Sequence, residues 1–316
     1  VDLRGRPVDV VAIRRLCEVL VHRGPDDEGY HVDGPVALGQ RRLAILDLAG
    51  GRQPMSNEAG TVWITFNGEI YNYAELRSEL EAVGHRFATR ADTEVLLHGW
   101  EEWGEGMLSR LNGIFAFALT DCRRGVTVLA RDPVGVKPLY LGVQGRLTWW
   151  ASELGAAGEA GLVSGIVSRE ALKLFLMFRF VPAPAAILER TWKIPPGHIV
   201  VLRSTDAGQA PAFRSYAKGV RSSAAPRGRS DWRDALIGEL EGAVTRQLMS
   251  DVPVGSLLSG GVDSSLVTLM MRRHLPYHPQ AFGIGFSSEG DESEARAAER
   301  AARALGVPYT PTWVND

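Results

Sequence analysis

The chain has 316 residues, a length that suits about two domains. Hydrophobic residues make up 45% of it and charged residues 23%, which is typical of a globular protein and excludes a disordered or fibrous chain. The formal net charge of −2 disfavours a nucleic-acid-binding protein, because such proteins carry a concentrated basic excess. We therefore expect no nucleic-acid partner.

Two cysteines, Cys17 and Cys122, are too few for a disulfide framework, and the sequence starts without the apolar core of a signal peptide. No apolar run approaches the roughly 20 residues of a membrane-spanning helix. A cytoplasmic location without a membrane partner is the expectation. Cys17 lies four residues after Ile13 and three before Leu20, on one apolar helical face, which predicts a buried structural thiol.

Residues 1–205 predict an α+β domain with many short strands. Helical spacing of apolar residues indicates helices over residues 7–21, 72–84, 92–103 and 168–178, and Asn72 suits the N-cap of the second. Strand-like runs lie at residues 36–48, 61–68, 138–143 and 147–153, and residues 113–132 predict a hairpin with its turn at 121–125.

The pattern changes after a polar segment, residues 206–230, which we interpret as a linker. From residue 231 onward, helices at 232–249, 266–274 and 291–306 alternate with strands at 254–258, 281–286 and from 307. Such alternation predicts βαβ crossovers and a parallel sheet, so residues 231–316 form a second, α/β domain.

The loop SGGVDSS, residues 259–265, follows a predicted strand and opens a helix. Its two glycines let the backbone approach an anion closely, and its serine hydroxyls lie near a helix N-terminus, whose dipole favours negative charge. Asp263 would repel phosphate unless a cation lies between them, which predicts a Mg²⁺ ligand. The alternative is a tight βα turn in which Ser264 only caps the helix.

The segment LSGGVDSS resembles the PP-loop of the ATP pyrophosphatase family, which holds the pyrophosphate of ATP while a substrate is adenylated. Adenylation accounts for the absence of the P-loop lysine, which serves γ-phosphoryl transfer. The resemblance implies ATP contacts from Leu258, Ser259, Gly260, Gly261, Val262, Asp263, Ser264, Ser265 and Ile284, with Mg²⁺ at Asp263.

Seven further motifs occur in the order seen in glutamine-hydrolysing asparagine synthetases, and the resemblance spans nearly the whole chain. They are HRGPD, RLAILD, FNGEIYN, ADTE, LNGIFAFALTD, RDPVGVKPLY and KIPPGH. The resemblance implies that residues 1–205 are a class II glutamine amidotransferase domain, with the N-terminal-nucleophile hydrolase fold of two stacked antiparallel sheets between helices. Residues 231–316 would be the first part of the PP-loop synthetase domain, and a homodimer is the family expectation.

Glutamine needs a cation for its carboxylate, anions for its ammonium group and donors for the oxyanion that forms when its amide is attacked. Arg42 is the candidate for the carboxylate, and Glu69 and Asp92 are candidates for the ammonium group. The oxyanion hole is expected at the Asn67 side chain and the Gly68 N–H. The resemblance adds Leu43, Ala44, Ile45 and Leu46 as glutamine contacts. In isolation, Arg42 also fits a solvated strand charge and Asp92 a helix start.

The family's glutaminase uses an N-terminal cysteine as nucleophile, whereas this sequence starts at Val1. We therefore expect that residues are missing at both ends, with a degraded gene product as the alternative, and that this polypeptide alone hydrolyses no glutamine. The expected function is ATP-dependent amidation of aspartate through an acyl-adenylate, with ammonia from glutamine. The alternatives are a relative that amidates or cyclises another carboxylate, such as a β-lactam synthetase or lasso-peptide cyclase, and a non-catalytic fragment that binds nucleotide.

Overall fold

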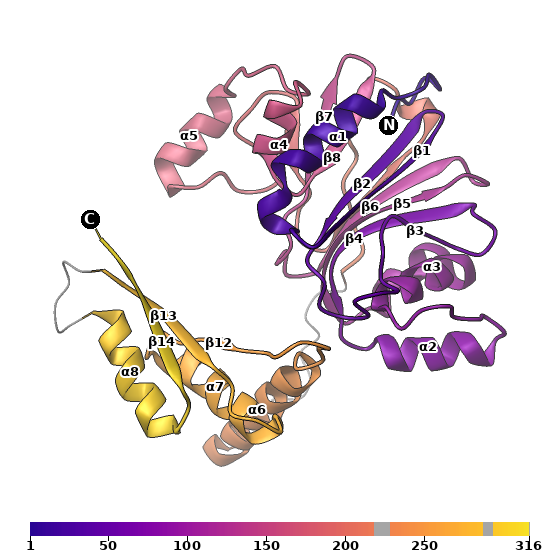
Figure 1. The fold of residues 1–316 in the computed structure, drawn as a ribbon. Coiled ribbons are helices and arrows are strands. Elements are labelled where there is room, and N and C mark those ends of the chain that lie inside the picture. Colours follow the sequence, from indigo (N-terminus) through magenta and orange to yellow (C-terminus); the bar gives the residue numbers. More distant parts are fainter. Residues whose placement is uncertain (218–227, 287–292, 316) are drawn as a thin grey trace. The chain divides into compact units, whose positions relative to one another are not determined.

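The computed structural model describes residues 1–217, 228–286 and 293–315 (Figure 1). The chain divides into two compact units, Val1–Val220 and Arg221–Asp316, and each is described by itself. Within the described ranges, no helix combines the length and the apolar character that a membrane crossing requires.

A six-stranded antiparallel sheet forms the centre of the first unit, with the strand order β11-β10-β6-β5-β4-β3 (Figure 1). Its strands are β3 (Met55–Ser56), β4 (Val62–Ile70), β5 (Gly113–Asp121), β6 (Val126–Arg131), β10 (His198–Leu202) and β11 (Arg214–Ser215). The predicted hairpin is confirmed, because β5 pairs with β6 from Asp121↔Val126 onward.

Side-chain alternation along β5 separates two cores. Phe115, Phe117 and Leu119 point to the core shared with α2 (Tyr73–Ala82) and α3 (Asp92–Trp103), whereas Ala116 and Ala118 point to the opposite core. That second core joins the large sheet to β2 (Val36–Arg42) and to β7 (Tyr140–Gln144). The unit is therefore layered, with helices on one face of the large sheet and further strands on the other.

The remaining strands of this unit form two small antiparallel sheets, and helices cover them. The sheets are β1 (Asp27–Asp33) with β2, and β8 (Leu147–Ala151), β7 and β9 (Thr191–Lys193). A third core packs α1 (Val10–Val19) and α4 (Leu154–Glu159) against β8 (Figure 1). The layers of the first unit therefore follow the order helix, sheet, sheet, helix. The helix α5 (Arg169–Phe178) follows α4 in the sequence.

The second unit contains the predicted parallel sheet, with the strand order β12-β13-β14 (Figure 1). Its elements are α6 (Arg229–Arg246), β12 (Ser256–Leu257), α7 (Val262–His274), β13 (Ala281–Phe286), α8 (Glu294–Leu305) and β14 (Tyr309–Val314). Leu258, Ala281 and three residues of α8 and its C-terminal end form one core. The predicted start of α8 at residue 291 lies outside the described residues.

Several local predictions need correction. The helix predicted over residues 232–249 is Arg229–Arg246, and the helix predicted from residue 266 already begins at Val262. The first helix begins at Val10 instead of residue 7, because Asp9 caps it by accepting a hydrogen bond from the Val11 N–H. The strand expected over residues 36–48 ends at Arg42, where the chain turns into a loop. Asn72 does not cap its helix, since its side chain binds residues 110 and 112 instead.

Candidate active site

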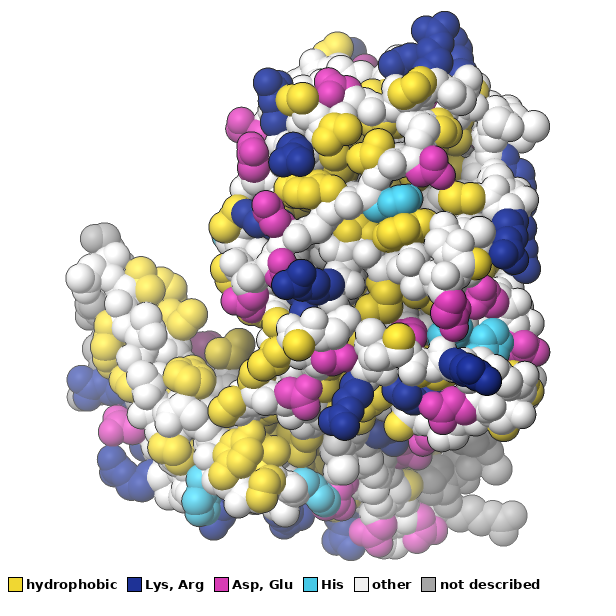
Figure 2. All heavy atoms as spheres, turned by 45° about the vertical axis from the view of Figure 1, so that its right-hand side comes forward, with side chains coloured by type: hydrophobic (Ala, Val, Ile, Leu, Met, Phe, Trp, Pro, Cys, Tyr) yellow, Lys and Arg dark blue, Asp and Glu magenta, His cyan; other side chains and the backbone are white. Residues whose placement is uncertain are grey.

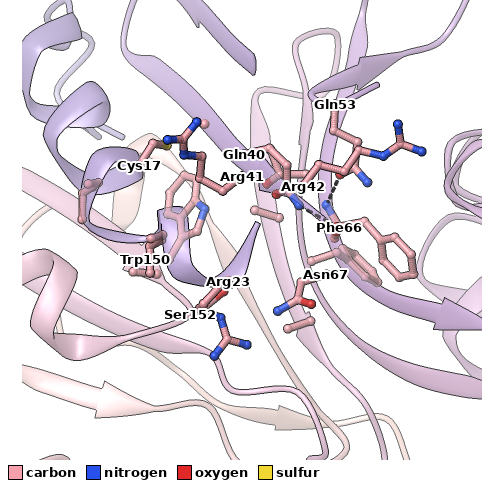
Figure 3. Close-up of a pocket in the computed structure, with 18 of the residues that line it drawn as sticks. Cys17, Arg23, Gln40, Arg41, Arg42, Gln53, Phe66, Asn67, Trp150 and Ser152 are labelled. Carbon is pink, nitrogen blue, oxygen red and sulfur yellow. Dashed lines mark hydrogen bonds between the residues drawn. The ribbon is translucent and has the colours of Figure 1, made fainter. Parts of the chain in front are cut away.

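A cavity of about 500 Å³ opens in the first unit, lined by residues of α1, β2, β4 and β8 and by the start of α3. Figure 3 shows part of its lining. Ala44 is the one predicted glutamine contact that does not line it; its N–H donates to Asp26 Oδ2. The other eight line it together: Arg42, Leu43, Ile45, Leu46, Asn67, Gly68, Glu69 and Asp92. Residues up to 50 positions apart in the sequence thus meet in one place.

Arg42 is a buried residue that organises the loop after β2. Its Nη2 donates to the carbonyl oxygens of Leu46 (2.9 Å) and Asp47 (2.8 Å), and its Nη1 donates to that of Leu48 (3.1 Å). Arg42 is 8% exposed, so it is not a solvated strand charge. Of the five guanidinium N–H groups, the three loop bonds leave the Nε–H and one on Nη1 for another acceptor.

The second half of β4 has one open edge, because β5 pairs with all of β4 whereas β3 pairs only near its start. The N–H groups of alternate residues in a strand point to the same edge. The Phe66 N–H donates to Gln53 Oε1 (2.6 Å) and the Ile70 N–H donates to Asp92 Oδ2 (2.8 Å). The N–H of Gly68, midway between them, therefore faces the same open edge.

The side chains of β4 alternate in the same way. Phe66 and Ile70 lie in the core beneath α2 and α3, so Asn67 and Glu69 point to the opposite face, where they line the cavity. Figure 3 shows Asn67 at this place. A Cβ atom at Gly68 would collide with the carbonyl oxygen of Ile114 on β5, so only glycine fits there. An amide side chain and an open backbone N–H thus lie next to each other along one strand.

Two carboxyl groups, Glu69 and Asp92, interact electrostatically at this cavity. Burial first and the charge of Asp92 second raise the pKa of Glu69 to about 8, although Lys137 and Arg42 act in the opposite direction. Burial raises the pKa of Asp92 to about 6, against backbone N–H bonds that lower it. The pair lacks sufficient compensating positive charge, which is what an ammonium ligand supplies. Asp92 also begins α3, as its alternative interpretation expects, and a helix start does not prevent the carboxylate from binding a ligand.

The loop after β6 brings Lys137 to the cavity. The side chains of Asp132 and Arg131 both form hydrogen bonds with the backbone of this loop. Asp132, fully buried, accepts hydrogen bonds from the backbone N–H groups of Val134, Gly135, Val136 and Lys137, and of Phe115 on β5. The Arg131 guanidinium donates to the carbonyl oxygens of Gly135 and Lys137, each at 2.7 Å. The motif RDPVGVKPLY contains all of these groups except the Phe115 N–H, but the motif by itself assigned no role to Lys137.

The cysteines of the described chain do not supply a reactive thiolate. Cys17 is 2% exposed, and burial is the main cause that raises its pKa to about 11, which confirms the prediction of a structural thiol. Cys122 is an exposed residue, but the partial burial of its thiol and the nearby Asp33 raise the pKa of this thiol as well.

In the second unit, the predicted ATP residues lie around the turn from β12 to α7. Gly260 has φ of +82°, and a Cβ there would collide with the backbone of α8 at Ala297. The Ser259 and Ser264 hydroxyl oxygens lie 3.1 Å apart. Ile284 lies on β13, which pairs in parallel with β12 through Leu257 and Phe282.

The other loop residues differ in exposure. Leu258 is buried in the core of this unit, whereas Ile284 is 59% exposed on β13. Asp263 is exposed in the first turn of α7, as are Gly261 and Val262, while Ser265 is half-buried. An exposed carboxylate and hydroxyl groups at the carboxyl end of a parallel strand suit a Mg²⁺-bound phosphate ligand.

A separate cluster in the first unit was not predicted. Ring nitrogens of His85 and His98 and an oxygen of Glu101 lie within 4.8 Å of one another, a grouping of metal-ligand type among the described residues. His98 Nδ1 lies 3.3 Å from Glu101 and its Nε2 lies 3.6 Å from Glu94. Burial lowers the pKa of His98, but these two carboxylates outweigh it and raise the pKa. A charged His98 between two carboxylates accounts for the cluster as an ion pair, although only its Nδ1 makes a hydrogen bond and its Nε2 makes none.

Residues 5–216, more than half of the chain, match the family described as glutamine amidotransferase domain. The chain belongs to the glutamine amidotransferase family. Residues 235–315 of this amidotransferase-family chain match the family described as asparagine synthase.

Curated relatives match both units. The chain is 39% identical to asparagine synthetase [glutamine-hydrolyzing] 1 of Bacillus subtilis, over 93% of this chain and 46% of the relative. It is 40% identical to asparagine synthetase [glutamine-hydrolyzing] of Sandersonia aurantiaca, over 94% of this chain and 51% of the relative. The chain thus spans about half the length of the curated relatives it matches.

Proposed function

We propose that this protein makes asparagine from aspartate, ATP and glutamine. The glutamine would bind in the cavity of the first unit, and aspartate would be activated at the loop of the second. The observation that carries the glutamine half is the combination of an open Gly68 N–H with the carboxyl pair Glu69 and Asp92 in one cavity. Relatives named as glutamine-hydrolysing asparagine synthetases support the pairing of the two activities.

In the glutamine site, the ammonium group of the substrate lies between Glu69 and Asp92, and the free N–H groups of Arg42 bind its carboxylate. The side-chain carbonyl then points to the Asn67 amide and the Gly68 N–H, which donate to the oxyanion as the amide is attacked. The attacking thiol is the N-terminal cysteine that the resemblance implies. Neither Cys17 nor Cys122 supplies this thiol, because burial is the first cause that raises the pKa of each.

In the synthetase site, the backbone of Gly260 and Gly261 and the hydroxyls of Ser259, Ser264 and Ser265 bind the pyrophosphate part of ATP, with Asp263 on Mg²⁺. The aspartate side chain attacks the α-phosphate, which forms an acyl-adenylate and releases pyrophosphate. Activation is needed because a carboxylate is a poor electrophile. Ammonia from the first site attacks the acyl carbon, and AMP leaves. Ammonia that is kept from water on its way to the acyl carbon stays unprotonated and therefore nucleophilic.

Pyrophosphate release by the protein expressed from its complete gene tests this proposal. We expect pyrophosphate release that depends on aspartate and that does not increase when other dicarboxylic acids are added. Dependence on a different carboxylate would assign the protein to the group of amidating or cyclising relatives. Release with no acid, or none under any condition, would contradict asparagine synthesis.

A further inference from the structure

The open edge of β4 is closed at Phe66 by side chains in place of a strand. Gln53 Oε1 accepts a hydrogen bond from the Phe66 N–H (2.6 Å), and Gln40 Nε2 donates to the Phe66 carbonyl oxygen (3.1 Å) (Figure 3). Two glutamine side chains thus satisfy the two backbone groups that a neighbouring strand would otherwise bind. Phe66 directly precedes Asn67, so this clamp lies at the start of the expected oxyanion hole.

Gln53 also reaches α3. Its Nε2 donates to Thr93 Oγ1 (3.4 Å), and Thr93 follows Asp92, whose carboxylate binds the Ile70 N–H. The strand edge is therefore fastened to the first turn of α3 at Phe66 and at Ile70. The Gly68 N–H lies between these two attachments, two residues from each.

The backbone of Gln53 is itself fixed in place. A Cβ atom at Gly29 on β1 would collide with the Gln53 carbonyl oxygen, so the two backbones are in close contact. Gln53 also follows the loop whose carbonyl groups Arg42 binds. One side chain therefore connects that loop, the β4 edge and the start of α3.

We infer that Gln53 is a positioning residue for glutamine hydrolysis, which sets the place of the Asn67 amide and the Gly68 N–H relative to the substrate carbonyl. This inference rests on the proposed function of the cavity. Oxyanion donors act only within a narrow distance of the forming charge, so a strand edge that moves by a fraction of an ångström loses rate before it loses binding. Gln53 does not touch the substrate in this account.

The test uses the protein from the complete gene and the variants Gln53→Met and Gln53→Glu. Methionine keeps the length but removes the acceptor for the Phe66 N–H. Glutamate keeps this acceptor, and the Thr93 hydroxyl, which is both donor and acceptor, can turn to donate to it. We expect Gln53→Met to lower kcat for glutamine hydrolysis by roughly 30-fold with KM changed by less than about 3-fold. Gln53→Glu should recover kcat to within about 3-fold of wild type.

Hydrogen exchange gives a readout that does not depend on activity. In Gln53→Met the amide of Phe66 should exchange faster, whereas in Gln53→Glu it should stay protected. Synthesis from free ammonia, measured in parallel, should match wild type in both variants. Equal loss in both variants and with both nitrogen sources would mean that Gln53 is a folding residue, which overturns the inference.

Different results would overturn the positioning role of Gln53 and the proposed function of the cavity. A wild-type protein that hydrolyses glutamine, with a Gln53→Met variant of unchanged kcat, would overturn the positioning role alone. A wild-type protein that hydrolyses no glutamine would overturn the proposed function. In that case the exchange of the Phe66 amide still reports whether Gln53 holds the strand, and unchanged exchange in Gln53→Met would contradict the clamp as well.

Discussion

Glu69 carries a charge that depends on pH within the working range of most enzymes. Its pKa of about 8 and that of Asp92, about 6, both lie above the usual carboxyl values, chiefly because of burial. An ammonium group binds the ionised pair best, so glutamine binding should release protons. The affinity for glutamine therefore rises as the pH increases through these two pKa values.

We predict that KM for glutamine falls by roughly 100-fold between pH 6 and pH 8, measured as glutamate formation by the complete protein, because the fraction of sites with both carboxyl groups ionised rises by about that factor. Glu69→Gln should raise KM and flatten this dependence above pH 7, because its amide cannot ionise. An unchanged pH dependence in Glu69→Gln would show that another group titrates. Glu79→Gln removes an exposed carboxylate that lies outside the cavity and pairs with Arg110, so it serves as a control with the wild-type profile.

Arg42 has two tasks in this account, since it holds the loop after β2 and is assigned to the substrate carboxylate. Arg42→Ala should raise KM for glutamine by roughly 100-fold and spare synthesis with free ammonia. Arg42→Lys should recover little, because one ammonium group cannot replace a planar fork that binds three carbonyl groups. Steady-state kinetics with both nitrogen sources checks this; equal loss with each source would make Arg42 purely structural.

At this scale, the sequence located the site residues only through the order of motifs. Arg42, Asn67, Glu69 and Asp92 were predicted from the resemblance, and the cavity brings them together. Gln53 was missed, because its partner Phe66 is 13 residues away and the contact depends on which edge of β4 is open. No local pattern in the sequence encodes that edge.

Among the elements, the loop after β6 depends on one buried carboxylate. Asp132 accepts five backbone N–H groups, four of them from consecutive residues of the loop that carries Lys137. Asp132→Ala should reduce the free energy of unfolding by about 3 kcal/mol, because these donors lose their acceptor. Urea denaturation measures this change in the free energy of unfolding.

Asp206→Ala is the matched control for Asp132→Ala. Asp206 also accepts a backbone N–H, that of Arg203, but in an exposed turn where water can replace it. Asp206→Ala should reduce the free energy of unfolding by less than about 1 kcal/mol. Similar losses in the two variants would show that burial of Asp132 does not decide its contribution.

Periodicity predicted where most helices and strands lie, but not where each begins or ends. The helices over 92–103 and, with its Ser168 cap, 169–178 agree with the prediction. The strand expected to continue to residue 48 ends at Arg42 because a buried guanidinium binds the following carbonyl groups, a tertiary interaction that apolar patterning cannot reveal. The resemblance implied the layering of the first unit, whereas which alternate side chains face which core became clear only from the structure.

For the whole molecule, the two proposed activities should separate by mutation. Asp263→Asn should abolish Mg²⁺-ATP-dependent pyrophosphate release, because an amide does not compensate the metal charge, and should leave glutamine hydrolysis intact. Pyrophosphate and glutamate assays on the same preparation check both halves. Unchanged pyrophosphate release would remove Asp263 from the metal site.

The account is tested most directly by transfer of nitrogen from one site to the other. The complete protein, given aspartate, Mg²⁺-ATP and glutamine labelled with ¹⁵N in its side-chain amide, should form asparagine with the label in its own side-chain amide. Mass spectrometry of the product reads this out. Unlabelled product, or glutamate formed from glutamine with no asparagine while aspartate and ATP are saturating, would contradict the proposed function.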